Sequence, residues 1–353
     1  TPLNFSGELT FVTGIEGNVE NHTRKTNPIV DYGPFGRRLE PTAVKADGDS
    51  IYYEAVTKNS RLTAASGCMH HLEGAPYEVS ACKEELAVSL TYTAAAEQGE
   101  TVCLEKYICY SSDLDMDREE LETYTGKMLR CAAAAGYAQA EKEQISYMNR
   151  YWEKADVVVK GDEALQQGIR FNLFHIMQSG GRDGRTGMGA KGLSGEGYEG
   201  HYFWDTEMYV FPVFVYTDPE IAAHLLDYRY GTLDKARARA RILGHDKGAL
   251  YPWRTINGEE ASTYYPLGTA QYHINGDISY ALCLYLDVTK DKEFFLEKGA
   301  EMLIEMARVW ADVGSFAECK GGKYCICDVT GPDEYNVLVD NNFYTNLLAR
   351  ESL

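Results

Sequence analysis

A change in hydrophobic periodicity near residue 118 constrains the fold of this 353-residue chain more than any other feature. Upstream of it, apolar and polar residues alternate in segments rich in β-branched and aromatic side chains, and clusters of Gly, Asn, Asp and Pro separate these segments. Such short runs, bounded by turn residues, are typical of β-strands. They lie at residues 8–13, 50–56, 86–92 and 101–107. We therefore predict that residues 1–118 form part of an N-terminal β-sandwich.

Downstream of residue 118 the pattern is helical. Residues 119–154 are rich in Ala, Glu, Lys, Met and Gln and contain no Pro, which favours a helical linker over 119–158. Further helices are predicted at 163–178, 206–215, 219–230, 232–243, 277–286, 292–313 and from 342 onward. Loops dense in Gly, Trp, Tyr, Asp and Glu connect them, and connecting loops often carry binding and catalytic residues. The sequence therefore indicates a multidomain α and β protein.

The composition excludes some partners. The chain has 53 acidic and 34 basic side chains and a formal net charge of −19, whereas nucleic-acid binders carry clustered Lys and Arg. No apolar run approaches the roughly 18–20 residues that a membrane helix needs. We therefore expect neither a nucleic acid nor a membrane as partner. The 26 Tyr and 4 Trp suit sugar rings, but they suit ordinary packing as well.

The nine cysteines are scattered along the chain, and only Cys319, Cys325 and Cys327 form a cluster. No second Cys pair or nearby His completes a zinc-binding spacing, so we expect no metal site. Reduced thiols in a reducing compartment are the better interpretation, which favours the cytoplasm.

The first loop that could carry chemistry covers residues 189–207. It is rich in glycine, which lets a backbone approach a ligand closely, and it ends at Trp204 and Asp205. The glycine spacing does not match a nucleotide-binding P-loop. Ligand binding and a mobile surface loop, with Asp205 as the N-cap of the next helix, remain equal alternatives.

The second loop covers residues 250–260 and contains Trp253, Arg254 and Glu259. A Trp beside an Arg and carboxylates is costly to bury and suits a polar cleft. The alternative is an exposed turn at Asn257, followed by a solvated pair of acids.

The third loop, residues 264–277, leads into a helix whose N-cap we expect at Asn275, Gly276 or Asp277. His273 lies in it, and a lone His is more often a half-buried, hydrogen-bonded imidazole than a catalyst or a metal ligand.

The fourth loop contains Gly331-Pro332-Asp333-Glu334-Tyr335 and continues to residue 346. Gly-Pro favours a tight turn that presents the two acids at a fixed place. A carboxyl in an aromatic, partly dry pocket has a raised pKa and can donate a proton near neutral pH. The alternative is a plain Asp/Glu turn, with Asn341 or Asn342 capping the last helix.

Together these loops resemble glycoside hydrolase family 65, the inverting disaccharide phosphorylases that include trehalose, nigerose, kojibiose and maltose phosphorylases. The resemblance follows the family's order and spacing and extends through the β-rich part to span essentially the whole chain. The segments that carry it are residues 190–207, 253–260, 268–277, 331–335 and 341–346.

The resemblance implies a β-sandwich, a helical linker and, over 159–353, the first part of an (α/α)6 barrel that forms the catalytic domain. The family's motifs would make Glu334 the general acid and would make Trp204 and Asp205 hold the sugar whose bond is broken. The remaining candidates for substrate binding are Trp253, Arg254, Glu259, His273 and Asn275, with Glu259 the best candidate contact on the aglycone side.

The implied reaction is inverting phosphorolysis of an α-linked glucose disaccharide to β-glucose 1-phosphate and a free sugar. One acid suffices, because the co-substrate, inorganic phosphate, arrives charged and needs no catalytic base. No cofactor is implied. Two alternatives remain: an acid-trehalase-like inverting hydrolase, in which a second carboxylate activates water, and a sugar-binding or assembly fragment that is inactive without its missing half.

Two features depart from the family pattern. Asn336 follows the GPDEY motif where the family often has His or Thr, and this could alter a contact beside the acid. Family members are also about twice as long, so the start of the sandwich is expected before Thr1 and the phosphate-binding loops beyond Leu353. We expect a complementary C-terminal polypeptide, or a part that was lost, and the family suggests a homodimer.

Overall fold

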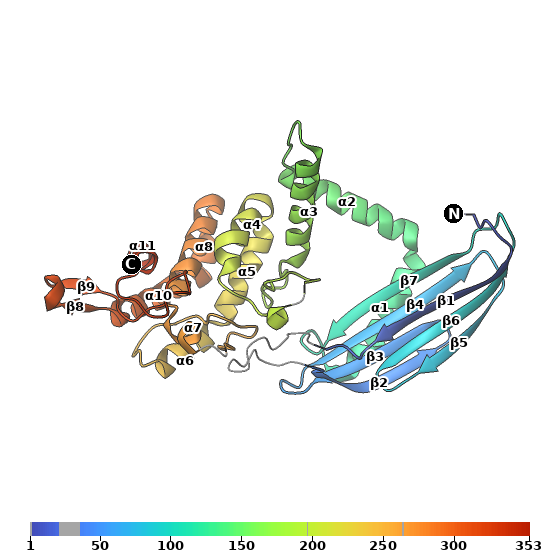
Figure 1. Ribbon diagram of the computed structural model, residues 1–353, viewed down its shortest axis with the longest axis horizontal. Helices are drawn as coiled ribbons and strands as arrows, with labels where there is room; N and C mark the ends of the chain where they lie inside the picture. Colours follow the sequence, from blue (N-terminus) through green and yellow to red (C-terminus); the bar gives the residue numbers. More distant parts are fainter. Residues whose placement is uncertain (1, 21–35, 196, 263–264) are drawn as a thin grey trace. The chain divides into compact units, whose positions relative to one another are not determined.

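The structure is a computed structural model that describes residues 2–20, 36–195, 197–262 and 265–353. The described residues divide into two compact units, one ending at Met148 and the other beginning at Asn149 (Figure 1). The first unit is built mainly of strands and the second mainly of helices, as the change in periodicity predicts. Each unit is described separately below.

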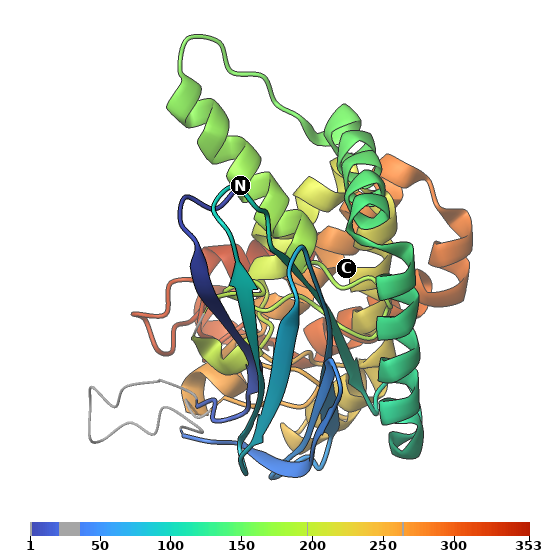
Figure 2. The ribbon, with the colours of Figure 1, turned by 90° about the vertical axis from the view of Figure 1, so that its right-hand side faces the viewer.

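The first unit contains two antiparallel sheets (Figures 1 and 2). The three-stranded sheet has the order β1-β6-β5, and the four-stranded sheet has the order β2-β3-β4-β7. The strands are β1 (Gly7–Glu16), β2 (Leu39–Asp47), β3 (Ser50–Thr57), β4 (Thr63–Glu73), β5 (Tyr77–Lys83), β6 (Ala87–Ala96) and β7 (Cys103–Ser112).

The two sheets share one hydrophobic core. The alternation along β6 is strict, because every second side chain from Val88 to Ala94 is buried while the intervening ones are partly exposed. These side chains pack against the buried face of β3 and β4. The core consists of Ile51, Tyr53, Ala55, Cys68, Leu72, Val88, Leu90, Tyr92 and Ala94. A period of two with one buried face is the property that the sequence pattern relies on.

The four predicted strands are confirmed as β1, β3, β6 and β7, and three further described strands of this unit, β2, β4 and β5, were not predicted. Every residue of β5 is exposed, so β5 shows no alternation of burial. The strand β2 contains Pro41, beside which its register with β3 shifts, and proline is normally confined to edge strands and bulges. In β4 small residues and paired histidines replace the usual β-branched side chains.

The predicted helix over 119–154 is two helices. The first, α1 (Leu121–Ala135), ends at Gly136, whose φ of +78° a helix cannot continue, and α2 (Tyr137–Ala155) begins directly after it. The first helix contacts β4 and β7 and buries Leu121, Thr125 and Leu129. Glycine at position 67 of β4 permits this contact, because a Cβ there would lie 2.5 Å from Cγ2 of Thr125.

The second unit is a set of helices around one apolar core. Its helices are α3 (Glu163–Ser179), α4 (Phe211–Thr217), α5 (Pro219–Gly231), α6 (Leu233–Ile242), α7 (Tyr265–Ala270), α8 (His273–Thr289), α9 (Lys292–Phe294), α10 (Ala300–Val313) and α11 (Phe343–Ser352). The strands β8 (Ser315–Ala317) and β9 (Lys323–Cys325) form a hairpin after α10. Each predicted helix from 163 onward is confirmed, with corrections at three positions.

The helix α8 is central in the second unit, since it contacts α4, α5, α10 and α11. It begins at His273, so Asn275, Gly276 and Asp277 lie inside it and none of them is its N-cap. Gly276 lets α11 approach, because a Cβ there would lie 2.4 Å from Cβ of Leu348. The other two corrections are π-helical turns, at Thr206–Val210 before α4 and at Phe295–Gly299 before α10.

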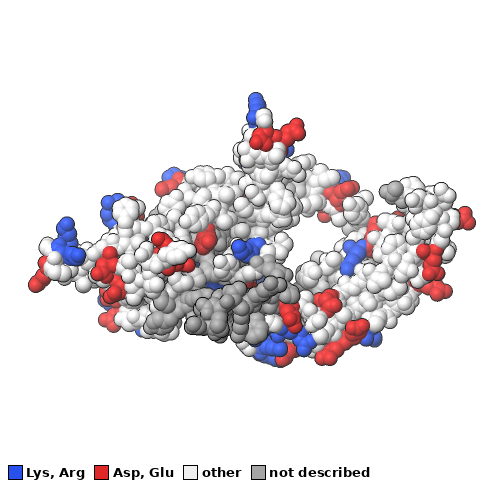
Figure 3. All heavy atoms as spheres, viewed as in Figure 1, with Lys and Arg blue, Asp and Glu red and all other residues white. Residues whose placement is uncertain are grey.

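Acidic and basic side chains are interspersed on the face that Figure 3 shows, and its described residues form no continuous basic patch there. Of the helices that the structure describes, none combines the length and the apolar character needed to cross a membrane.

Candidate active site

Residues from all four loops meet around two tryptophans. Phe203 is buried and lies edge-to-face against Trp253 from the second loop, with ring centroids 5.0 Å apart. The indole of Trp204 lies edge-on against the imidazole of His273 from the third loop, with centroids 4.9 Å apart. Tyr344 of α11 packs 5.5 Å from the same imidazole. The sequence predicted these loops separately, and the structure brings them together.

Asp205 is exposed and directly follows the buried Trp204. It occupies the N-cap position of the turn Thr206–Val210, as the alternative predicts, but its side chain makes no capping hydrogen bond there. In the described part of the chain it forms no ion pair either. Partial burial raises its pKa, and the nearby carboxylates of Glu207 and Glu334 raise it further. Such an acid is available for a ligand, and it lies within electrostatic reach of the predicted acid.

The raised pKa of Asp205 predicts how stability depends on pH. A carboxyl whose pKa is raised by folding contributes stability that is complete below its ordinary pKa and is lost as the pH rises through the raised value. Asp205→Asn removes this loss. We expect the variant to have a higher Tm than the wild type at pH 7 and the same Tm near pH 3, about one unit below the ordinary pKa of Asp, measured by thermal unfolding at both pH values. A difference in Tm that did not change with pH would contradict this.

The fourth loop holds Glu334 at its tip. Thr330 donates from its backbone nitrogen to the carbonyl oxygen of Ala270 at 2.9 Å, and Val329 exchanges two backbone hydrogen bonds with Val339. Between these anchors residues 333–338 are exposed, including Glu334. A carboxylate oxygen of Glu334 accepts a hydrogen bond of 2.9 Å from Nε2 of Gln271. The acid is therefore oriented by one buried amide and is open to a ligand on its other sides.

A chain of side chains continues inward from Gln271. Its Oε1 lies 3.1 Å from Nε2 of His273, and Nδ1 of His273 lies 2.7 Å from Oδ2 of Asp277, one helical turn later. The hydroxyl of Tyr344 donates to Oδ1 of Asp277 at 2.6 Å. His273 and Asp277 are fully buried, and burial raises the pKa of Asp277. Sequence reasoning missed Gln271 and Asp277, although Gln271 lies two residues before the singled-out histidine and the sequence suggests Asp277 as a cap.

The second loop is held by an acid that the sequence pattern does not single out. Glu260 accepts hydrogen bonds from the backbone nitrogens of Trp253 at 2.7 Å and Arg254 at 3.1 Å. Burial raises its pKa, while Arg239, 3.4 Å away, acts in the opposite direction. Glu260 therefore fixes the loop, and Trp253 and Arg254 are both buried.

The other polar residues of this loop have different surroundings. The guanidinium of Arg254 pairs with the carboxylate of Glu199 from the glycine-rich first loop, so that the two loops are joined by an ion pair of which both side chains are 8% exposed. Glu259 is exposed and lies 3.6 Å from Lys235 of α6. Asn275 is buried behind the loop, where its amide bonds to the backbone of Tyr251 and Ala249.

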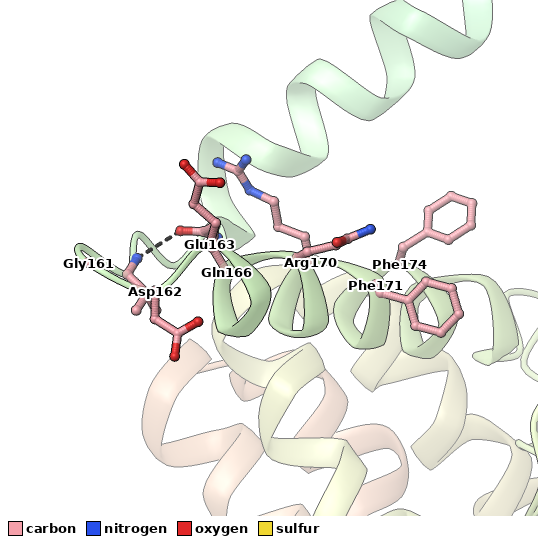
Figure 4. Close-up of a pocket in the computed structure, with 9 residues that line it drawn as sticks. Gly161, Asp162, Glu163, Gln166, Arg170, Phe171 and Phe174 are labelled. Carbon is pink, nitrogen blue, oxygen red and sulfur yellow. Dashed lines mark hydrogen bonds between the residues drawn. The ribbon is translucent and has the colours of Figure 1, made fainter.

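A separate pocket of about 560 Å³ lies along α3 (Figure 4). Gln166, Arg170, Phe171 and Phe174 line it, with the loop that precedes the helix. Its arginine is already engaged, because Arg170 forms a two-pronged ion pair with Asp156. None of the predicted site residues lies in it, so we place the candidate active site at the tryptophans and Glu334.

Comparisons with known proteins match both units of the chain. A family model described as "Glycosyl hydrolase family 65, N-terminal domain" matches residues 1–151, and one described as "Glycosyl hydrolase family 65 central catalytic domain" matches residues 170–353. The second match includes all of the candidate site residues.

Relatives with assigned names match along nearly the whole chain. The α,α-trehalose phosphorylase of Thermoanaerobacter brockii is 47% identical over all of this chain and 46% of its own length. The maltose phosphorylase of Bacillus subtilis is 34% identical over 98% of this chain and 44% of its own length. A solved structure from the human microbiome, assigned as a kojibiose phosphorylase, superposes with a TM-score of 0.82 at 27% identity over 99% of this chain and 45% of its own. The chain thus spans about half the length of these relatives.

Proposed function

The chain belongs to glycoside hydrolase family 65, and from this premise we propose that it supplies the acid-bearing part of a disaccharide phosphorylase. The reaction is phosphorolysis of an α-linked glucose disaccharide to β-glucose 1-phosphate and a free sugar, with inversion at the anomeric carbon. The relatives support this choice of reaction, since they are named trehalose and maltose phosphorylases. The observation that carries the assignment of the acid is the orientation of the Glu334 carboxyl by Gln271.

We assign the proton transfer to Glu334. The protonated carboxyl gives its proton to the glycosidic oxygen as the bond from that oxygen to the anomeric carbon breaks. A phosphate oxygen attacks the same carbon from the opposite face, so one carbon–oxygen bond replaces another and the configuration inverts. Phosphate is already an anion, and no second carboxylate has to activate it. Glu334 ends ionised and regains a proton before the next cycle.

The sugar that is cleaved is proposed to lie against Trp204 and Asp205. A partly exposed carboxylate accepts hydrogen bonds from sugar hydroxyls, and an indole offers them an apolar surface. The burial of Trp204 against His273 keeps this surface rigid. We place Trp253, Arg254 and Glu259 on the aglycone side, where Glu260 and Asn275 hold their loop in shape.

The remaining half of the family length is proposed to complete the site. The phosphate-binding groups are assigned to it, together with the helices that would close an (α/α)6 barrel. Exposed apolar side chains on α3, Leu165 and Phe171, offer a surface for such helices. This remaining part is either continuous with the present chain or a separate, complementary polypeptide. For the complete protein we propose a homodimer in the cytoplasm.

Phosphate dependence tests the proposal. The full-length protein is incubated with trehalose, with and without inorganic phosphate, and glucose and glucose 1-phosphate are measured. We expect sugar release only with phosphate, in equal amounts with glucose 1-phosphate. Equal glucose release without phosphate would identify an inverting hydrolase instead. Saturable trehalose binding without turnover in the full-length protein would identify a sugar-binding role.

A further inference from the structure

We propose that Gln271 couples the acid Glu334 to the buried His273–Asp277 pair, so that the acid and the pair share one transferable proton. This proton is additional to the one that the pair always keeps between Nδ1 of His273 and Asp277. This inference rests on the proposed function, in which Glu334 donates the proton. Gln271, His273 and Asp277 are then positioning residues, because none of them touches the reacting atoms.

The amide of Gln271 has two ends with different partners. Its side chain is 3% exposed, Nε2 faces Glu334 at 2.9 Å and Oε1 faces His273 at 3.1 Å. An amide nitrogen only donates and an amide oxygen only accepts. The orientation of this amide therefore depends on which neighbour is able to donate.

With Glu334 ionised, every donor and acceptor in the hydrogen-bond network from Glu334 to Asp277 can be assigned. Nε2 of Gln271 donates to the carboxylate, so Oε1 must accept from a proton on Nε2 of His273. Nδ1 of His273 faces Asp277 at 2.7 Å, and this short contact needs a proton as well. The pair then holds two protons: one on Nε2, and one between Nδ1 and Asp277.

With Glu334 protonated, the assignment reverses. The carboxylic acid donates to Oε1 of Gln271 after a half-turn of the amide, and Nε2 of Gln271 donates to the bare Nε2 of His273. The imidazole keeps its one proton on Nδ1 and donates it to the Asp277 carboxylate. The number of protons and the total charge are the same in the two arrangements. A state with a proton at both ends, or at neither, leaves the amide facing two donors or two acceptors.

The surroundings of the pair favour retention of the extra proton. His273 and Asp277 are fully buried, and a lone carboxylate is costly there. The titratable groups that face Asp277 are His273, Tyr344 from α11, and Glu207 from the turn after Asp205. The charge of Glu207 is compensated by its own partner Arg229. Trp204 covers the edge of the imidazole, and this contact excludes water on that side.

This coupling gives an exposed acid a source for its proton. A solvent-exposed carboxyl is ordinarily ionised at neutral pH. The pair is a second place for the same proton, so the acid and the pair together release it to solvent only at a higher pH than the acid alone would. The limb of the pH profile at high pH therefore belongs to the network rather than to Glu334 alone.

Two variants shift this limb in opposite directions. Asp277→Asn cannot hold the extra proton, so we expect the high-pH limb of kcat/KM for trehalose phosphorolysis to move to lower pH by about one unit. Tyr344→Phe removes a donor from the Asp277 carboxylate, which then holds a proton more tightly. Its limb is expected to move to higher pH by about half a unit. Both profiles are measured on the full-length protein at saturating phosphate.

The connection through Gln271 supplies the matched control. In the Gln271→Met background, Tyr344→Phe is expected to leave the limb unmoved, because the path from Asp277 to Glu334 is cut. This comparison also replaces Asp277→Asn if that variant fails to fold. The coupling is overturned if the high-pH limbs of Asp277→Asn and Tyr344→Phe do not move, or if both move in the same direction. It is also overturned if Tyr344→Phe still moves the limb in the Gln271→Met background.

The failure of the proposed function gives a different result. If the wild type cleaves trehalose without phosphate, the phosphorylase assignment fails, and the same variants then test the coupling on hydrolysis. If phosphorolysis is observed and the limbs stay fixed, only the coupling fails. Histidine-labelled NMR of the protein without substrate adds a readout that needs no activity, because Nδ1 of His273 is expected to share a proton with Asp277 in the wild type and to carry none in Asp277→Asn, where the asparagine amide donates to it.

Discussion

Glu334→Gln is expected to lower kcat for phosphorolysis of the natural disaccharide by about 10²–10⁴-fold, because the amide keeps the shape of the side chain and cannot give up a proton. The disaccharide should still bind with a similar KM, since Trp204, Asp205 and the second loop are untouched. The fold should be unaffected, because Glu334 is exposed and, among the described residues, its side chain is hydrogen-bonded to Gln271 alone. Steady-state kinetics of the full-length variant, with Tm as a check of folding, measure this.

Asp340→Asn is the matched control for this variant. It makes the same carboxyl-to-amide change in the same loop, and its Oδ1 can still accept the hydrogen bond from the backbone nitrogen of Asp328. We expect it to keep near-normal activity. Activity of Glu334→Gln within tenfold of the wild type would remove Glu334 from the role of acid. An equal loss in Asp340→Asn would attribute the effect to the loop as a whole.

Glu207→Gln is expected to lower the free energy of unfolding of the second unit by about 3–5 kcal/mol. Glu207 and Arg229 form a two-pronged ion pair, at 2.6 and 2.9 Å, in which the side chains are 6% and 2% exposed. Loss of the carboxylate leaves a buried guanidinium without a counter-charge. Glu207 belongs to the π-helical turn that follows Asp205, so its loss should also loosen the sugar-binding segment. Urea unfolding, followed by tryptophan fluorescence of the second unit, measures the effect.

Two controls separate charge burial from general sensitivity. Asp287→Asn breaks the exposed pair with Lys290 in the same unit and is expected to cost below about 1 kcal/mol. The double variant Glu207→Leu with Arg229→Met removes both charges and should recover most of the lost stability, because well-packed apolar residues often replace such pairs without loss. If Glu207→Gln lowers the free energy of unfolding by no more than the surface control does, the account is contradicted.

The division of the chain into a strand-rich and a helix-rich unit follows from the sequence, because period-two and helical patterns are properties of local segments. The strands that escaped prediction lack that local signal. β5 has no buried residue, and β2 carries Pro41 at its register shift. Their positions are determined by neighbouring strands, β6 and β3, which supply the pairing. A sheet edge of this kind is specified by tertiary structure.

The motif residues of the candidate site could also be identified from the sequence, but their supports could not. Trp204 and Glu334 belong to contiguous motifs, which a linear reading can match. Gln271 matters because it reaches a carboxyl 63 positions later, and Glu260 matters because it folds back on the backbone of its own loop. The sequence does not show which of two adjacent acids, Glu259 or Glu260, turns inward. That choice is made by the buried Arg239 beneath the loop.

The central claim, that Glu334 protonates the leaving oxygen, is tested most directly with a substrate whose leaving group departs without a proton. The full-length wild type and Glu334→Gln are compared on trehalose and on 4-nitrophenyl α-glucoside, both with phosphate. If Glu334 is the general acid, the variant loses about 10²-fold or more on trehalose, while its rate on the activated glucoside stays within a few-fold of the wild type. Equal losses on the two substrates would contradict the account, because they would show that Glu334 acts in binding or in structure and not by giving its proton to the leaving oxygen.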